Sequence, residues 1–422
     1  MNANHTYYRA SSAGAAFPAL HGRKDVDVAI IGGGFAGLAT ALGLQERGAQ
    51  SIALLEAEQI GFGASGRNGG FVFGGFSLGN ASLIQQLGRP RARALYQLTL
   101  DAVELIRQRV ARYQIACDVN PSGVLLANWF DDDRVLQQVR TFMLQEFEVD
   151  WAPISREQSR DWLRSERYFG ALHERNAFHF HPLKYAQGLA AVLASAGVAV
   201  HENSRVLTIE STSGGHVVKT ASGELHCREL VLCCGGYIGR LYPALARAVL
   251  PIATYVMTTE PLGERLASAM QTQAAVYDTR FAFDYYRPLA DSRLLWGGRI
   301  SIRDRAPADV ARLLYGDLLK VYPQLAGVKV EHAWSGLMSY ARHEMPQIGQ
   351  LPNGIRYAMG FGGHGVGPTT LAGEVLAQAI HEGRPMPDGL SRYGLAPTFG
   401  PLGLLAAQLT YWYYELRDWW RQ

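Results

Sequence analysis

Cysteine, charge of one sign and long apolar runs are all scarce in this chain of 422 residues. Four cysteines are too few for a disulfide scaffold at this length, and none has the spacing of a zinc site. The net charge of +3 is too small to indicate a nucleic-acid partner, for which a clustered basic face is expected. We therefore expect reduced thiols, a cytoplasmic location, no metal ion and no nucleic acid.

No segment has the features of a signal peptide or of a spanning helix. The first twenty residues contain no apolar core of signal-peptide length. Residues 393–414 carry no charge, but Pro397, Gly400 and Pro401 interrupt the first half of this stretch. The remainder, 402–414, is too short to cross roughly 30 Å of hydrocarbon at about 1.5 Å per residue. We predict neither export nor a transmembrane helix.

Glycine, by contrast, is abundant and clustered. The 46 glycines make up about 11% of the chain, against an average of about 7%. Such an excess indicates backbone that closely approaches a ligand. Apolar residues make up 48%, which excludes a disordered chain, and the length predicts two or three domains. The composition favours a cofactor-binding α/β protein.

A dinucleotide-binding fingerprint lies near the start of the chain. Apolar runs at 27–31 and 51–55 are expected to be strands, with a helix over 35–47 between them. Gly32, Gly34 and Gly37 form GxGxxG after the first strand, which allows a tight turn, close approach of a pyrophosphate and close helix–strand packing. Phosphates would then lie at the helix N-terminus, and Glu56, after the second strand, would bind ribose hydroxyls.

The segments that follow favour FAD over NAD. A hydride donor such as NADH normally needs a second GxGxxG unit, and the nearest candidate, 232–239, lacks a following acid. Residues 61–70 instead form a glycine-rich loop in which Ser65, Arg67 and Asn68 could cradle the ribityl and phosphate region of a flavin. We predict FAD without NAD.

These motifs resemble those of the D-amino-acid-oxidase-type superfamily of FAD-dependent amine oxidoreductases, and within it the bacterial gamma-glutamylputrescine oxidoreductase group. The resemblance rests on seven stretches in the family's order: DVAIIGGGFAGLATA (27–41), LLEAEQIGFGASGRNGG (54–70), HPLKYAQGLA (181–190), LVLCCGGY (230–237), YYRPLADSRLLWGGR (285–299), MPQIGQL (345–351) and GFGGHGVGPTTLAGEVLA (360–377).

The resemblance implies an α/β fold in which a Rossmann-like FAD-binding domain is interleaved with an α+β substrate domain built on an antiparallel sheet. The FAD-binding domain would comprise residues 1–88, 181–250 and 346–395, and the substrate domain residues 89–180 and 251–345. Residues 396–422 would form an apolar, aromatic C-terminal helix. From the residues themselves, a helix is expected over 90–114, with separate strands at 225–227 and 230–234.

The fingerprint and the resemblance together predict the contacts to FAD. These are Gly32, Gly34, Phe35, Ala36, Gly37, Glu56, Ala57, Ser65, Arg67, Asn68, Gly69, Gly70, Val206, Gly235, Gly236, Gly362, Gly363, His364, Gly365, Val366 and Gly367. A strand at Val206 would pass the adenine, and the helix after Gly367 would stabilise negative charge on the flavin pyrimidine. Some members tether the flavin through a histidine near 65–68 or a cysteine in the last third; because neither is present here, we expect noncovalent FAD.

The implied reaction moves a hydride from the carbon beside an amine to flavin N5, and water hydrolyses the imine. Because the neutral amine reacts, an aromatic, desolvated pocket is expected. The aromatic candidates, most of which are expected to pack the sheet, are Tyr255, Phe281, Phe283, Tyr285, Tyr286, Trp296 and Trp334. Alternation places Phe281, Phe283 and Tyr285 on one face and Tyr286 on the other.

Arginines supply candidate groups for a substrate carboxylate. Arg287, Arg299 and Arg342 could bind it bidentately or form structural ion pairs. Tyr340 and Arg342 directly precede the return to the FAD domain, and His364 either donates to the flavin or is exposed. The catalytic candidates are Tyr285, Arg287, Trp296, Tyr340, Arg342 and His364.

The predicted function is FAD-dependent oxidation of a C–N bond in an amine or amino acid, with a gamma-glutamylputrescine-like substrate as the leading hypothesis and O2 or quinone as acceptor. One alternative is a secondary or cyclic amino acid dehydrogenase that reduces quinone; another is a non-catalytic flavin-binding partner protein. The tail 402–420 contains Trp412, Trp419 and Trp420. It is expected to dock on the protein or on a second copy, or to contact the inner face of the membrane.

Overall fold

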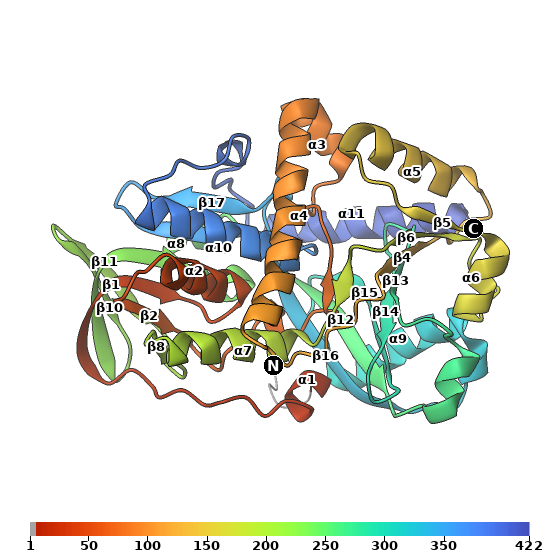
Figure 1. Ribbon diagram of the computed structural model, residues 1–422, viewed down its shortest axis with the longest axis horizontal. Helices are drawn as coiled ribbons and strands as arrows, with labels where there is room; N and C mark the ends of the chain where they lie inside the picture. Colours follow the sequence, from red (N-terminus) through yellow and green to blue (C-terminus); the bar gives the residue numbers. More distant parts are fainter. Residues whose placement is uncertain (1–5, 422) are drawn as a thin grey trace.

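Two sheets lie side by side in this computed structural model, which describes residues 6–421 (Figure 1). Residues 1–5 of the predicted segment 1–88 and Gln422 of the predicted tail lie outside the described part. Within it, no helix is long and apolar enough to cross a membrane.

The first sheet has the parallel centre that a βαβ start predicts. Its strands run in the order β17–β18–β11–β1–β2–β8, with the hairpin β9–β10 antiparallel on β11. Their bounds are β1 Gly22–Ile31, β2 Ile52–Leu55, β8 Ala199–His201, β9 Thr208–Thr212, β10 Gly215–Lys219, β11 Gly223–Leu232, β17 Gln347–Gln350 and β18 Arg356–Met359. All these strands fall in the three segments predicted for the FAD-binding domain. The two strands expected at 225–227 and 230–234 are one strand, β11, because β1 pairs with it along its full length.

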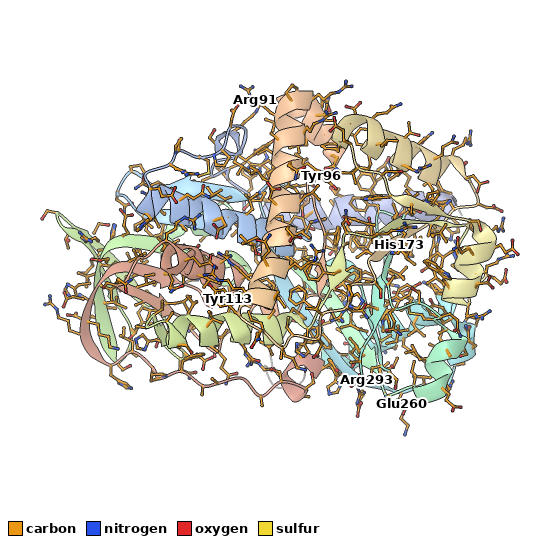
Figure 2. The ribbon with its side chains drawn as sticks, viewed as in Figure 1. Arg91, Tyr96, Tyr113, His173, Glu260 and Arg293 are labelled. Carbon is orange, nitrogen blue, oxygen red and sulfur yellow. The ribbon has the colours of Figure 1, made fainter. Side chains whose placement is uncertain are left out.

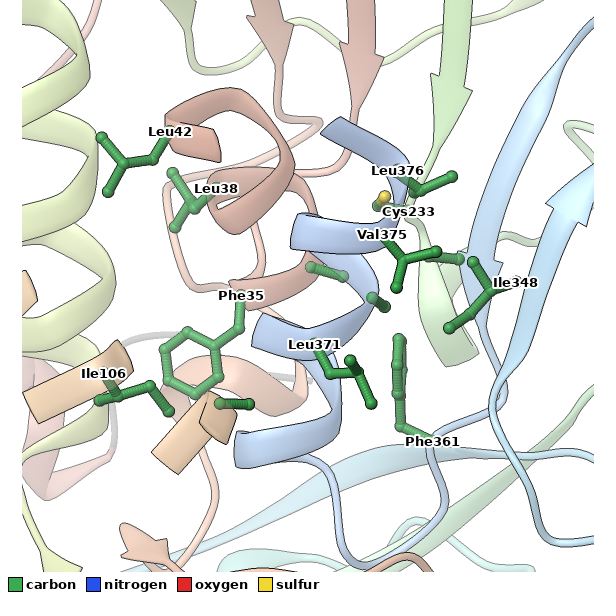
Figure 3. Packing of buried hydrophobic residues seen from close by; sticks show 14 of the residues in the cluster. Phe35, Leu38, Leu42, Ile106, Cys233, Ile348, Phe361, Leu371, Val375 and Leu376 are labelled. Atoms are coloured by element: carbon green, nitrogen blue, oxygen red, sulfur yellow. The ribbon is translucent and has the colours of Figure 1, made fainter. Parts of the chain in front are cut away.

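Helices cover one face of the first sheet. Val28 and Ile30 of β1 pack in one cluster with α2 (Phe35–Glu46), α7 (Pro182–Ser195) and α10 (Val366–His381). Figure 3 shows Leu371 and Val375 of α10 with Phe35 and Leu38 of α2 on one side and Ile348 and Phe361 on the other. Ala29 and Ile31, which alternate with these residues along β1, pack in a separate cluster on the opposite face.

The second sheet is antiparallel except for the parallel pair β13–β4. Its order is β16–β12–β15–β14–β13–β4–β6–β5. The bounds are β4 Val124–Ala127, β5 Ala152–Ile154, β6 Ala171–Glu174, β12 Leu250–Thr259, β13 Ala275–Asp278, β14 Tyr285–Pro288, β15 Leu294–Ser301 and β16 Val330–Tyr340. The helix α9 (Pro307–Val321) packs on this sheet through β16 and β12, and its apolar side belongs to the same buried cluster.

The remaining elements are short or lie around the two sheets. They are α1 Tyr7–Ala10, α3 Asn80–Leu87, α5 Arg134–Phe147, α6 Arg156–Leu163, α8 Pro243–Ala246, α11 Pro401–Trp420 and the pair β3 Phe71–Val72 with β7 Phe178–His179. In Figure 1, α11 runs behind the half of the molecule that contains the second sheet.

The helix α4 (Arg89–Arg112) crosses between the two halves (Figure 1) and belongs with the first. Figure 2 shows Arg91, Tyr96 and Tyr113 spread along it. Arg91 forms an ion pair with Asp388, and the Tyr113 hydroxyl donates to the Glu46 carboxylate of α2. The apolar side of α4 is part of the buried cluster that contains α2 and α10. The predicted boundary at 88/89 therefore separates α4 from the helices on which it packs.

Candidate functional site

A cavity of about 1020 Å³ lies between the two sheets. Its walls come from the carboxyl ends of β1, β2 and β11, from the loops after them, and from β12, β15 and β16. The volume is at the upper end of the range of about 300–1,000 Å³ for ligand sites. The cavity is therefore large enough for an extended cofactor together with a small substrate.

The glycine fingerprint is held by backbone contacts that exclude larger side chains. A Cβ on Gly37 would lie 2.0 Å from the carbonyl oxygen of Gly32. Gly32 itself has φ +115°, and a Cβ there would lie 2.6 Å from the carbonyl oxygen of Cys233. Gly34, the N-cap of α2, has no capping side chain, and the Phe35 N–H of the first turn donates to the Ser65 hydroxyl at 2.9 Å. Gly34, Phe35 and Ala36 line the cavity, so the N-terminus of α2 lies at its wall. This geometry suits an anion such as a pyrophosphate.

Glu56 stands at the end of β2, on the cavity wall. One carboxylate oxygen accepts from the Gly33 N–H at 2.7 Å, and the other accepts from the Glu58 N–H at 3.0 Å. Burial raises the pKa of Glu56, and these N–H groups oppose the rise. Each oxygen retains a lone pair, so the carboxylate can also accept from hydroxyls of a ribose.

The loop 64–70 is fixed by three donors from other parts of the chain. The carbonyl oxygens of residues 67, 68 and 69 accept from the Trp334 indole at 2.9 Å, the Tyr8 hydroxyl at 2.8 Å and the Arg287 guanidinium at 2.6 Å, respectively. None of these three donors lines the cavity, whereas Asn68 and Gly69 do. The carbonyls are therefore held toward the protein interior, behind the cavity wall.

All of the predicted FAD contacts except Gly37 and Gly70 line this cavity. Gly37 instead lets α2 pack against the glycine loop, and a Cβ on Gly70 would lie 2.2 Å from the Phe180 carbonyl oxygen. Val206 lines the cavity from the connection before β9, not from a strand. The contacts themselves stay a prediction.

Aromatic side chains form the wall on the side of the second sheet. Phe281, Phe283 and Tyr285 line the cavity, whereas Tyr286 points into the sheet core and stacks on Trp296 at 4.3 Å. The predicted alternation of faces is therefore present, although residues 281–284 form a turn and an irregular stretch before β14.

Two of the catalytic candidates lie outside the cavity. Trp296 is fully buried in the core of the second sheet. Arg287 is 3% exposed and donates to the carbonyls of Gly69 and Phe180 and to the Tyr8 hydroxyl. The prediction that Arg287 binds substrate does not match this position, because the N–H groups of the Arg287 guanidinium already donate to other groups of the protein.

Arg299 and Arg342 both line the cavity, but only one of them is paired. Arg299 makes two hydrogen bonds to Asp317, at 2.6 and 2.9 Å, so structural ion pairing accounts for it. Arg342 is exposed and lies over the Phe399 ring at 5.4 Å. No carboxylate among residues 6–421 forms an ion pair with Arg342. Its guanidinium is therefore available where the cavity opens.

Tyr340 lies against the glycine loop 362–367, which contains His364 and leads into α10. A Cβ on Gly363 would lie 2.9 Å from the Tyr340 hydroxyl, and burial raises the pKa of Tyr340 to about 12. His364 packs edge-on against Phe73 at 4.2 Å, and burial lowers its pKa to about 4. Both side chains are therefore neutral near pH 7, and His364 is not a solvent-exposed side chain.

The sequence reasoning missed the contribution of the C-terminal segment to this site. Phe399, Gly403, Ala406, Thr410 and Tyr411 all line the cavity. Nothing local marks these residues as site residues, since they are small or aromatic and lie beyond every glycine motif. The aromatic enrichment of 411–420 was the one available signal.

A nucleotide-binding glycine loop that lies in the same cavity as an aromatic wall is typical of an oxidoreductase that uses a nucleotide cofactor. The family described as FAD dependent oxidoreductase (DAO) matches residues 27–379, and the chain belongs to this family. It is therefore an FAD-dependent enzyme that acts on amines or amino acids. The tight glycine turn, the Glu56 carboxylate and the cavity volume all fit FAD.

Several known proteins are similar to this chain. Gamma-glutamylputrescine oxidoreductase of Escherichia coli K12 is 37% identical over 89% of this chain and 88% of that protein. A probable oxidoreductase, OrdL, of Haemophilus influenzae is 33% identical over 86% of this chain and 85% of that protein. The crystal structure of glycine oxidase from Geobacillus kaustophilus has a TM-score of 0.72 at 22% identity, over 88% of this chain and 98% of that one. At that identity the structural likeness shows the fold alone.

Proposed function

We propose that the substrate is an amine that carries a carboxylate away from the reacting nitrogen, with a gamma-glutamylated diamine such as gamma-glutamylputrescine as the leading candidate. One observation supports this proposal most directly: an unpaired arginine, Arg342, at the opening of an aromatic-lined cavity. The similarity to gamma-glutamylputrescine oxidoreductase, at 37% identity, points the same way.

Bound FAD supplies the hydride acceptor for the oxidation of the C–N bond. The chain's own residues then have two tasks. Phe281, Phe283 and Tyr285 give the cavity an apolar wall. Against bound substrate this wall would favour the neutral amine over the ammonium ion and leave its nitrogen lone pair free to assist the departure of hydride. Arg342 holds the carboxylate bidentately and orients the substrate along the cavity. Tyr340 and His364, both neutral, shape the wall beside the α10 loop.

Anaerobic bleaching of the flavin absorbance tests the proposal. We expect gamma-glutamylputrescine to bleach the flavin at far lower concentration than putrescine, which lacks the carboxylate. Arg342→Met should raise KM for gamma-glutamylputrescine about 10- to 100-fold, with little change in kcat and none in the putrescine reaction. Arg312→Met, at an exposed position of α9, is the matched control.

Other outcomes select the alternatives. Equal bleaching by both amines, or an unchanged KM in Arg342→Met, removes the carboxylate hypothesis. Bleaching by N-methylglycine or proline alone indicates a secondary or cyclic amino acid dehydrogenase. A flavin that no amine bleaches indicates a non-catalytic flavin-binding protein.

We further propose that FAD is held noncovalently, that O2 or a quinone reoxidises it, and that the enzyme works in the cytoplasm. The cytoplasm is supported by the cysteines, all four of which are free thiols. Acid precipitation should release all yellow colour into the supernatant. Readmission of air or of a soluble quinone after bleaching, with the rates compared, identifies the acceptor.

A further inference from the structure

The C-terminal helix α11 is attached to the second-sheet half by hydrogen bonds and by packing of aromatic rings. Asp418 accepts hydrogen bonds from the backbone N–H groups of Phe281 and Ala282, at 2.7 and 3.2 Å. Gln408 accepts from the N–H of Ile302 at 3.1 Å, and the Tyr414 ring stacks on Phe281 at 4.2 Å. These contacts orient the helix and determine which of its sides faces outward.

The outward side of α11 is almost wholly apolar. We call it the outer face; it consists of Leu402, Leu405, Leu409, Trp412, Tyr413, Leu416, Trp419 and Trp420, each at least 49% exposed. Elsewhere between residues 6 and 421, the large exposed apolar side chains are Val119, Leu144 and Leu207, together with Phe281, Phe283 and Phe399, which line the cavity. A contiguous patch of this kind marks an interaction surface.

Leu402, Leu405, Leu409, Trp412, Leu416 and Trp419 repeat at intervals of three and four residues, so they form one stripe along the helix. Tyr413 and Trp420 widen that stripe beyond the seam of a two-stranded coiled coil. The face therefore fits a broad apolar surface better than a single partner helix.

Charge distinguishes between the possible occupants of the outer face. Arg417 of this helix and Arg421, which directly follows it, are exposed; Arg417 lies over the Tyr414 ring and Arg421 over the Phe130 ring. Both acids of α11 are engaged within the protein: Glu415, whose side chain is half-exposed, lies 3.7 Å from Arg299, and Asp418 is buried. A second copy docked here would find no unpaired carboxylate on α11 for its arginines, whereas anionic lipid headgroups would pair with them.

We propose that the outer face of α11 binds the surface of a membrane that contains anionic lipids. The helix would lie in the plane of the interface, with its leucines below the headgroups, its tryptophans and Tyr413 at headgroup level and Arg417 on lipid phosphates. Because Ala406, Thr410 and Tyr411 on the inner side line the cavity, docking would bring that cavity within one helix of the lipid.

Vesicle flotation of the full-length holoenzyme tests this proposal. We expect binding to vesicles of phosphatidylcholine with about one third phosphatidylglycerol, and weak binding to pure phosphatidylcholine. The double variant Leu409→Gln/Trp412→Gln should reduce binding at least tenfold, and Arg417→Gln should reduce it several-fold at low salt only. Leu207→Gln, at a position 57% exposed on the first-sheet half, is the matched control and should bind like the unmodified protein.

The flavin absorbance and the thermal unfolding midpoint of each variant must match those of the unmodified protein. A loss of vesicle binding can then not be attributed to a loss of folding. Two results would overturn the proposal. One is absence of binding to the anionic vesicles. The other is a dimer in sedimentation that the double variant converts to monomer, which would assign the outer face to a second copy. Because flotation needs no turnover, its result is independent of the proposed substrate.

Discussion

The variant Arg287→Met tests whether Arg287 positions the loop 64–70 or binds the substrate. The Arg287 guanidinium is buried and donates to the carbonyls of Gly69 and Phe180, at 2.6 and 2.9 Å, and to the Tyr8 hydroxyl at 3.2 Å. Within residues 6–421 it has no carboxylate partner. Its role in the structure is therefore to hold the loop behind the FAD site.

The size of the effect follows from these contacts. Each buried carbonyl left without a donor costs about 1–3 kcal/mol, so losing both donors lowers the free energy of unfolding by about 2–6 kcal/mol. That is a large share of a total stability of about 5–15 kcal/mol. Relief of a buried, unpaired charge offsets part of this loss. We expect a net destabilisation of at least about 2 kcal/mol and at least a tenfold weaker hold on FAD.

Denaturant unfolding and FAD retention on ultrafiltration measure these two quantities, and steady-state kinetics at saturating FAD measures KM. Arg287→Lys should behave almost like the methionine variant, because an ammonium group cannot reach the same acceptors in the geometry of a planar guanidinium. Normal stability and full FAD retention, together with a KM raised tenfold and restored by lysine, would refute this reasoning. Such a result would return Arg287 to the role of substrate ligand.

Three further predictions concern buried groups. Burial raises the pKa of Glu174 to about 8, so the unfolded chain loses this proton before the folded protein does as pH rises. The variant Glu174→Gln should therefore be about 1–4 kcal/mol more stable than the unmodified protein at pH 8.5, and the difference should close toward pH 5 in denaturant titrations. Burial, together with nearby positive charge, lowers the pKa of His179 and His181 to about 3. The contribution of these two histidines to stability should therefore be complete above about pH 6.5 and fall progressively below it, and an unfolding midpoint independent of pH from 7 to 4.5 would contradict this. Gly37→Ala places a Cβ 2.0 Å from a backbone oxygen and should abolish FAD binding by absorbance, whereas Gly316→Ala, in open space on α9, should be neutral or slightly stabilising.

Much of the first sheet could be predicted because its signals are local. The apolar run, the glycines and the helix of residues 27–47 lie within one βαβ unit, and each glycine has a backbone reason to be there. The loop 362–367 before α10 was recognisable in the same way. Contacts between segments distant in sequence were less accessible. The apolar stripe of α4 does not indicate which helices it will meet, and it packs in one cluster with α2 and α10, across the predicted boundary at 88/89.

Local sequence could not distinguish among the three candidate arginines. Arg287, Arg299 and Arg342 are chemically identical, and each lies in or near a strand of the second sheet. Folding brings a loop from more than two hundred residues away against Arg287 and brings Asp317 against Arg299, while Arg342 is left at the cavity opening. Which guanidinium is free depends on partners that are distant in sequence.

The sequence by itself determined the nucleotide fingerprint, the preference for FAD and the apolar character of the tail, because these depend on residue types at short spacing. Only the tertiary structure decided that Trp296 is core, that Arg287 supports a loop and that α11 both lines the cavity and exposes an apolar face. The physical reason is that burial and charge pairing are set by contacts between distant segments, and those contacts exist only in the folded chain.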